Sequence, residues 1–170
     1  QDGFEPLLDG FVPAPYNDSK WLIDYAKKDK NVIAILLESI QGEGGIIIPD
    51  SNYLSDVRKI CNEHNWLMLV DEVQSGFCRT GKWFGYQHSN IIPDVVMLAK
   101  ALGNGLPIGA CLAKGISAQV LTAGSHGSTF GGNFLSTAVG LKVIEIMKNQ
   151  DICMNVSKVG EYFKKELDDK

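Results

Sequence analysis

The sequence lacks the features that mark membrane-spanning, repeat and metal-binding proteins. It contains no apolar run long enough to cross a bilayer, no internal repeat and no low-complexity tract. Its cysteines, Cys61, Cys78, Cys111 and Cys153, are widely scattered without a C-x-x-C pair, and its histidines also lack metal-ligand spacing. We therefore expect no metal site, and reduced thiols rather than a disulfide framework, in the cytoplasm or an organellar matrix.

The sequence also has no excess of positive charge, and its first residue is not methionine. The formal net charge is −4 and the pI is near 5.3, which argues against nucleic acid and membrane surfaces as partners. The chain starts at Gln1 with neither methionine nor a signal peptide, so we expect an internal piece of a longer protein. Its 170 residues, 45% of them hydrophobic, are enough for one domain with a real core.

The sequence does contain an alternation of helix and strand patterns. Ser19 and Ser51 are expected to cap two amphipathic helices. Apolar runs predict strands over residues 32–37, 67–71, 95–100 and 108–113. Strands separated by helices imply right-handed crossovers, so we expect an α/β fold with a mainly parallel sheet and helices on both faces.

Two further helices are predicted at the end of the chain. The first, over residues 133–147, is apolar almost all round, which predicts that it is buried. The second is amphipathic, and residues 149–151 form a junction between the two.

Two of the predicted strands end on residues with complementary chemistry. Asp71 and Lys100 close neighbouring apolar runs, so a parallel sheet would deliver both to its carboxyl edge, where ligands bind in such sheets. A lysine amine can form a Schiff base with an aldehyde, and an aspartate facing a pyridine nitrogen keeps that nitrogen protonated. The pair therefore suits an enzyme that uses pyridoxal 5'-phosphate (PLP).

Other candidate cofactor contacts lie in two loops. Val73 and Gln74 follow the first of these strands closely enough to contact a cofactor held at its end. In the glycine-rich segment 124–132, Ser128 and Thr129 offer hydroxyl donors to a phosphate near a helix N-terminus. A core position for Val73 and an ordinary flexible loop over 124–132 are the alternative interpretations.

Residues 76–82 fit the nucleotide phosphate-loop pattern G-x-x-x-x-G-K, but the context is wrong for it. Trp83 stands where that motif needs a magnesium-binding serine or threonine, and the acidic strand precedes the loop with too little chain between them. We therefore discard nucleotide binding.

Four segments in order resemble the class III, ornithine-type, PLP aminotransferases, most nearly those that act on acetylornithine. They are Glu38–Gly45, Asp71–Gly76 with Arg79–Gly81, Leu98–Gly103 and Ser125–Asn133. The resemblance implies that residues 1–150 are the central part of a PLP-binding large domain. Residues 151–170 would then be a helix leading toward a small C-terminal domain.

The resemblance also implies roles for single residues. Lys100 is expected to form the internal aldimine with PLP, and Asp71 to partner the pyridine nitrogen. Gln74 is expected to hydrogen-bond the phenolic oxygen of the cofactor, and Val73 to pack on its ring. Glu43 matches the acidic residue that switches the site between an amine-bearing substrate and glutamate.

Ser128 and Thr129 resemble residues that reach the phosphate of the neighbouring subunit's cofactor, which implies a homodimer with a shared active site. The chain also departs from the family, since Ser39 stands where its members usually have proline. The upstream phosphate loop and the substrate-binding arginine of the family have no counterpart here. We do not expect the only two arginines, Arg58 and Arg79, to bind a substrate carboxylate.

The expected reaction is transamination of the ω-amino group of N-acetylornithine or N-succinyl-diaminopimelate, with 2-oxoglutarate as the acceptor. It would serve arginine or lysine biosynthesis. Ornithine and γ-aminobutyrate are alternative donors, because enzymes that act on them share this core. A second alternative is a non-catalytic fragment that only binds a partner.

Overall fold

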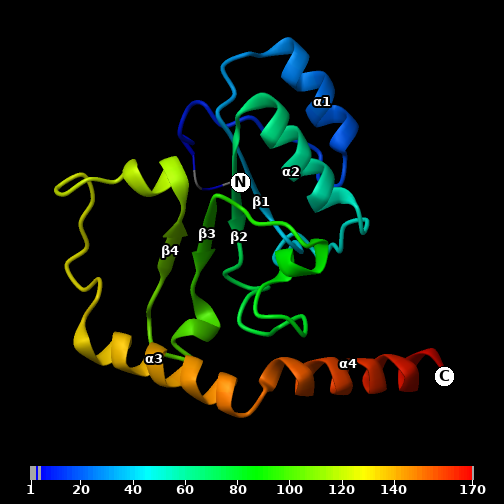
Figure 1. Cartoon of the computed structure of the whole chain (residues 1–170), viewed down its shortest axis with the longest axis vertical. Helices are drawn as coiled ribbons and strands as arrows, with labels where there is room; N and C mark the ends of the chain where they lie inside the picture. The colour runs from blue at the N-terminus through cyan, green and yellow to red at the C-terminus, as the bar shows by residue number, and fades with distance from the viewer. Residues whose placement is uncertain (1–2, 4, 170) are drawn as a thin grey trace.

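The structure, a computed structural model, describes residue 3 and residues 5–169, and its helices and strands alternate as the sequence predicts (Figure 1). The strands are β1 (Ala34–Glu38), β2 (Leu67–Asp71), β3 (Val95–Leu98) and β4 (Ala110–Ala113). The α-helices are α1 (Ser19–Lys28), α2 (Tyr53–His64), α3 (Phe134–Asn149) and α4 (Ile152–Asp168). Short 3₁₀ helices are η1 (Gly85–Ser89), η2 (Lys100–Leu102) and η3 (Gly115–Gln119). None of the helices described is both long and apolar enough to span a bilayer.

The strands lie side by side in chain order. β1, β2 and β3 are parallel to one another, and β4 runs antiparallel to β3. In this register Asp71 is opposite Glu38 on one side and Met97 on the other, so the three parallel strands end at one edge of the sheet. The prediction of an α/β fold with a mainly parallel sheet is confirmed.

The main core lies between the sheet and the helices α1 and α2. Leu37, Met68 and Val70 alternate with outward residues along their strands and pack against buried side chains of both helices, such as Leu22 and Val57. The expected helical covering is present on this face. On the opposite face the sheet is open to solvent, and Leu36 in β1 is 53% exposed.

The helix starts differ from the prediction by one residue each. Asp18, not Ser19, caps α1, because its carboxylate accepts a hydrogen bond of 2.8 Å from the backbone N–H of Trp21. Asn52, not Ser51, precedes α2, and its side chain makes no capping hydrogen bond. An aspartate cap is favourable because its negative charge also meets the positive end of the helix dipole.

α3 is not buried, and here the prediction is wrong. Ser136 and Gly140 are its buried residues, whereas Phe134 is 94% and Leu141 is 69% exposed. The helix contacts η2, and Gly140 packs closely against Leu102 there. A helix that is apolar all round must be covered on every side to be buried, and the described chain covers only one side.

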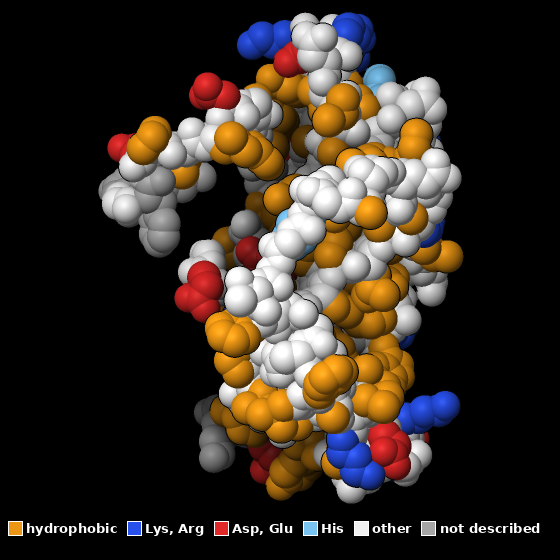
Figure 2. All heavy atoms as spheres, turned by 90° about the vertical axis from the view of Figure 1, so that its left-hand side faces the viewer, with side chains coloured by type: hydrophobic (Ala, Val, Ile, Leu, Met, Phe, Trp, Pro, Cys, Tyr) orange, Lys and Arg blue, Asp and Glu red, His pale blue; other side chains and the backbone are white. Residues whose placement is uncertain are grey.

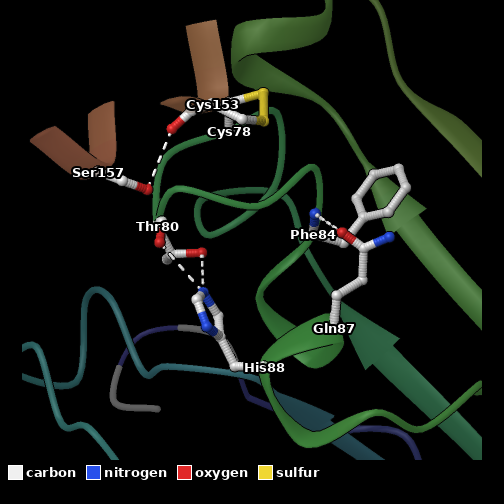
Figure 3. The surroundings of a disulfide bond; sticks show 7 residues. All are labelled: Cys78, Thr80, Phe84, Gln87, His88, Cys153 and Ser157. Atoms are coloured by element: carbon white, nitrogen blue, oxygen red, sulfur yellow. Dashed lines mark hydrogen bonds between the residues drawn. A yellow bond between two sulfur atoms is a disulfide. The ribbon is translucent and has the colours of Figure 1, made fainter. Parts of the chain in front are cut away.

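Cys78 and Cys153 form a disulfide, which corrects the expectation of reduced thiols (Figure 3). Their Cα atoms lie 4.8 Å apart, and the bond joins the loop after β2 to α4. α4 buries none of its residues, and next to the disulfide Ser157 fits against Gly81, where any side chain would collide with it. The pairing escaped the sequence analysis because the two cysteines are 75 residues apart. The other two cysteines are free thiols, as expected.

Candidate active site

Lys100 lies just beyond the carboxyl end of β3, where the chain turns into η2. Its φ angle is +45°, in the left-handed region that residues with a side chain seldom occupy. Such a conformation persists only where the surrounding structure enforces it, and it is concentrated at functional sites. The Lys100 Nζ donates a hydrogen bond of 2.8 Å to the Oε1 of Gln74, which follows the end of β2.

Lys100 and Gln74 face a cavity of about 540 Å³. Val73, Ser75 and Ala101 also line it, together with Ile40, Gln41, Gly42, Ile46, Ile48, Arg79 and Thr80. The wall is thus largely apolar, carries the two cations Lys100 and Arg79, and contains no carboxylate among the lining residues described. Such a cavity suits a flat apolar ligand with anionic groups.

The Gln74 amide is held closely by the opposite wall of the cavity. A Cβ at Gly42 would lie 2.6 Å from the Gln74 Cδ, so only glycine allows the amide to take this position. The loop that contains Gly42 is closed by paired backbone hydrogen bonds between Gln41 and Ile47, and by a bond of 2.9 Å from Gly42 N–H to the Glu38 carboxylate.

Asp71 occupies the neighbouring strand end but has a different local partner. Its Oδ1 accepts a hydrogen bond of 2.8 Å from the backbone N–H of Val73, and its side chain is half-buried. Asp71 is opposite Met97, three residues before Lys100, so both functional groups lie at the same edge of the sheet. Asp71 is not among the residues that line the cavity.

The other predicted site residues lie apart from this group. Glu43 is exposed at the tip of the loop between Gln41 and Ile47, whose base lines the cavity. Ser128 and Thr129 are exposed in the segment between η3 and α3, and neither lines the cavity.

Sequence reasoning missed the contribution of Arg79 and Thr80, which it placed in a structural loop. Both line the cavity, and Thr80 is fixed by His88, whose Nε2 lies 3.0 Å from its carbonyl oxygen and 3.1 Å from its Oγ1 (Figure 3). The signal that could have shown this is their position, five residues or more beyond Gln74 in a loop that must turn back from the sheet edge.

The residues present fit PLP. A lysine amine can bind its aldehyde, a glutamine amide can bond a ring substituent, and Val73 offers an apolar surface to a flat ring. The described residues contain no cluster of three or more His, Cys, Asp or Glu side chains that could hold a metal ion.

Comparison with known proteins agrees with this geometry. The family model "Aminotransferase class-III" matches residues 2–170. The chain belongs to this family. It is 48% identical, over 98% of its length, to the acetylornithine aminotransferase of Nitrosomonas europaea, and 42% identical, again over 98%, to the mitochondrial ornithine aminotransferase of Rattus norvegicus. It spans 42% and 38% of these two relatives, about two-fifths of their length.

Solved structures of class III aminotransferases have the same fold. The chain superimposes with a TM-score of 0.92 and 38% identity on the ornithine aminotransferase of Toxoplasma gondii, which was crystallised in the presence of oxidized glutathione and has partial occupancy of PLP at its active site. That match covers 98% of this chain and 39% of the other. The TM-score with the acetylornithine aminotransferase of Elizabethkingia anophelis is 0.90 at 38% identity, over 94% of this chain and 40% of that one.

Proposed function

We propose that the protein carrying this chain is a PLP-dependent aminotransferase and that the chain holds the reactive end of its cofactor. The observation that carries the proposal is the hydrogen bond between Lys100 Nζ and Gln74 Oε1 on the wall of a largely apolar cavity. Membership of the class III family and the PLP in the Toxoplasma gondii enzyme support it.

In this proposal four residues hold the cofactor. Lys100 supplies the amine that binds the aldehyde, Gln74 bonds the phenolic oxygen, Val73 packs on the ring and Asp71 holds the proton on the pyridine nitrogen. PLP, when bound, accepts the electrons left behind when a bond to the substrate Cα breaks. The free amine of Lys100 would be the base that moves the proton from that carbon.

The proposed amino donor is N-acetylornithine or N-succinyl-diaminopimelate, and the proposed acceptor is 2-oxoglutarate. The names of the bacterial relatives support acetylornithine and hence arginine biosynthesis. Ornithine remains the main alternative donor, as the name of the rat relative indicates. γ-Aminobutyrate is the second alternative. We assign Glu43 to the amine-bearing substrate, because it sits on the loop whose base lines the cavity.

We further propose a homodimer that buries the face formed by β4, η3 and the start of α3. Between Ala101 and Leu141 the only Lys, Arg, Asp or Glu is Lys114, and large apolar side chains gather on this face (Figure 2). The accessible surface is 11969 Å² for 18.6 kDa, whereas compact monomers of this mass expose roughly 8,200 Å². The most exposed apolar residues here are Ile116, Val120, Leu121, Phe130, Phe134, Leu135 and Leu141.

Ser128 and Thr129 are exposed within residues 115–141, which contain no Lys, Arg, Asp or Glu, and this place on the proposed dimer face supports their proposed role toward the cofactor phosphate of a second subunit. The dimer is tested by replacing Phe134, which is 94% exposed, with aspartate in the full-length protein. We expect a shift from dimer to monomer in analytical ultracentrifugation. A dimer that persists unchanged would contradict the proposed face.

We propose that the protein works in the cytoplasm or in an organellar matrix, and the name of the rat relative, which says that it is mitochondrial, supports the second alternative. Thiol reductants in such a compartment would act on the disulfide between Cys78 and Cys153.

The cofactor assignment is tested by adding PLP to the full-length protein and following its visible absorption. We expect a band that borohydride fixes onto Lys100, as peptide mass spectrometry would show. Lys100→Ala should abolish it, whereas Lys59→Ala, at an exposed lysine of α2, should retain it. If no band depends on Lys100, the chain is better explained as a non-catalytic binding piece.

The donor is tested by half-reactions of the loaded full-length enzyme. Acetylornithine, succinyl-diaminopimelate, ornithine and γ-aminobutyrate are each added without acceptor, and loss of the cofactor band is followed. We expect acetylornithine or succinyl-diaminopimelate to convert it fastest. Faster conversion by ornithine or γ-aminobutyrate would reassign the substrate, and no conversion by any of them would contradict transamination.

A further inference from the structure

Glu72, the residue directly after Asp71, is a buried carboxylate that the proposed chemistry does not use. Its side chain is 0% exposed. No lysine, arginine or histidine of the described residues pairs with it, since the ion pairs found there involve other carboxylates. A carboxylate without a counter-ion can stay in such a place only if hydrogen bonds replace its water.

Those hydrogen bonds are present, two on each oxygen. Oε1 accepts from the Ser39 hydroxyl at 2.5 Å and from the Tyr86 backbone N–H at 2.9 Å. Oε2 accepts from the Ser75 hydroxyl at 2.8 Å and from the Gly85 backbone N–H at 2.9 Å. An ionised carboxylate offers about four acceptor positions, so this one is fully satisfied.

The four donors come from three segments, two of which contribute residues to the wall of the cavity. Ser39 follows β1 and leads to the loop whose residues Gln41 and Gly42 line the cavity. Ser75 lines the cavity itself, next to Gln74. Gly85 begins η1, whose start is fixed by a bond of 3.1 Å from Phe84 N–H to the Gln87 Oε1 (Figure 3).

The backbone of Glu72 is tied on both sides as well. Its N–H donates to the Met97 carbonyl at 3.0 Å, on the strand that leads to Lys100, and its carbonyl accepts from Gly76 N–H at 3.0 Å. The space beside the carboxylate is also limited, because a Cβ at Gly85 would lie 2.9 Å from the Ser39 Cβ. Glu72 therefore has one position, and Asp71 and Gln74 are attached to it through one and two peptide bonds.

We propose that Glu72, anchored by the Ser39 hydroxyl, is a positioning residue that sets the geometry of Asp71 and Gln74 toward the cofactor. The inference rests on the proposed function, because it assigns Glu72 a role in the same site. The hydrogen bond from Ser39 adds a side-chain link between the residues that directly follow β1 and β2, 33 positions apart. This hydrogen bond is a feature of this chain, because the proline that usually stands at the position of Ser39 in the family would have no hydroxyl to donate.

The test compares two serines in the PLP-loaded full-length enzyme. Ser39→Ala removes one of the four bonds to Glu72 and leaves the other three. Ser55→Ala is the matched control, because the Ser55 hydroxyl also bridges a long separation, 34 residues to the Ser89 carbonyl, but does not contact Glu72. Visible absorption of the bound cofactor is titrated with pH, and kcat and KM are measured for the best donor.

We expect Ser39→Ala to shift the pH midpoint of the cofactor band and to lower kcat about tenfold with little change in KM, because small displacements of positioned groups are costly. Glu72→Gln should lower kcat further, by about a hundredfold. If Glu72→Gln does not fold, Ser39→Ala, which keeps the carboxylate, carries the test alone. Ser55→Ala should retain the wild-type midpoint and kcat.

Two failures can be told apart. If the wild-type protein forms no Lys100-dependent band, the proposed function itself is wrong. If the wild-type forms the band and turns over, but Ser39→Ala behaves like Ser55→Ala in both midpoint and kcat, the function stands and Glu72 is only a structural residue.

Discussion

The two halves of the chain use similar apolar residues in opposite ways. Around β1, β2, α1 and α2 the chain covers its own apolar side chains, and Val57, Met68 and Val70 are each 0% exposed. From β4 onward the chain leaves them in solvent, as Phe134 at 94% and Ile116 at 71% illustrate. The first half, up to β3, is therefore stabilised by its own core, and we call it the packed half. The second half, from β4 onward, presents an apolar surface suited to contact with another protein chain, and we call it the open half.

The comparison teaches that apolar character does not by itself determine burial. α2 has polar residues on its outer side and fits one face of the sheet, whereas α3 is apolar nearly all round and touches the rest of the chain on one side only. The predictions below test this difference, beginning with the largest effect.

Two methionines offer the most direct contrast. Met68 in β2 is fully buried, so Met68→Ala should lower the free energy of unfolding by about 2–5 kcal/mol through lost contacts and a cavity. Met154 in α4 is 50% exposed, and Met154→Ala should change it by less than about 0.5 kcal/mol. Urea unfolding measures both, and equal losses would refute the division into a packed and an open half.

The disulfide attaches α4, which buries none of its residues, to the loop after β2. Cys153→Ser should cost roughly 2–4 kcal/mol, because a closure spanning 75 residues is lost from the unfolded chain. Hydrogen exchange should show the loss of protection in α4 and leave α2 unchanged, since α4 buries no residue.

Thiol labelling provides the control for that experiment. In the oxidised protein only the exposed Cys111 should react, because burial raises the pKa of the Cys61 thiol to about 12 and shields it. Labelling of Cys78 and Cys153 before any reductant is added would contradict the disulfide.

Two ion pairs extend the contrast to charge. Arg58 on α2 bonds the Asp94 carboxylate at 2.6 Å with both side chains mostly buried, so Arg58→Met should cost about 1–3 kcal/mol. Lys142 and Glu145 on α3 form a pair of 3.0 Å that is more than half exposed, and Lys142→Met should cost less than about 0.5 kcal/mol. Urea unfolding measures both changes in the free energy of unfolding. Similar losses would show that burial does not determine how much each ion pair contributes to stability.

The smallest expected effect is on the stability of the folded chain at acidic pH. Burial acts to raise the pKa of Asp94, but hydrogen bonds from the Met68 N–H and from Arg58, with the charge of Arg58, outweigh it and hold the pKa below its usual value. The unfolded chain then takes up a proton first, so this stabilisation is complete above an unfolded pKa of about 3.9 and is lost as pH falls through the lower folded value.

Asp94→Asn should flatten that part of the profile. Urea unfolding of the wild type and the variant between pH 5 and the lowest pH at which the chain folds, on the order of pH 3, measures the difference. Equal slopes would show that Asp94 does not contribute.

The fold was largely predictable because its signals are local. The apolar run that ends at Asp71 is a strand with the predicted bounds, since a strand buried in a parallel sheet is a continuous apolar run. The strand before Lys100 was predicted too long, because it ends at Leu98 and the lysine begins a turn with positive φ. Residue type signals such a conformation at glycine and, more weakly, at asparagine and aspartate, but not at lysine.

The site was predictable only in part. That Val73, Gln74 and Lys100 share a cavity agrees with their neighbouring strand ends, but the walls contributed by Gly42 and Arg79 depend on how two loops fold back. Glu72 could not be distinguished from a surface residue, because its four donors lie on three separate segments.

The sequence by itself determined the class of fold, the succession of helices and strands along the chain and the delivery of Asp71 and Lys100 to one sheet edge, because each follows from short-range periodicity and from the geometry of parallel strands. Only the tertiary structure decided that Cys78 meets Cys153, that Glu72 is buried among four donors and that α3 is exposed. These depend on which distant segments come together, and that is set by packing over the whole chain rather than by any local pattern.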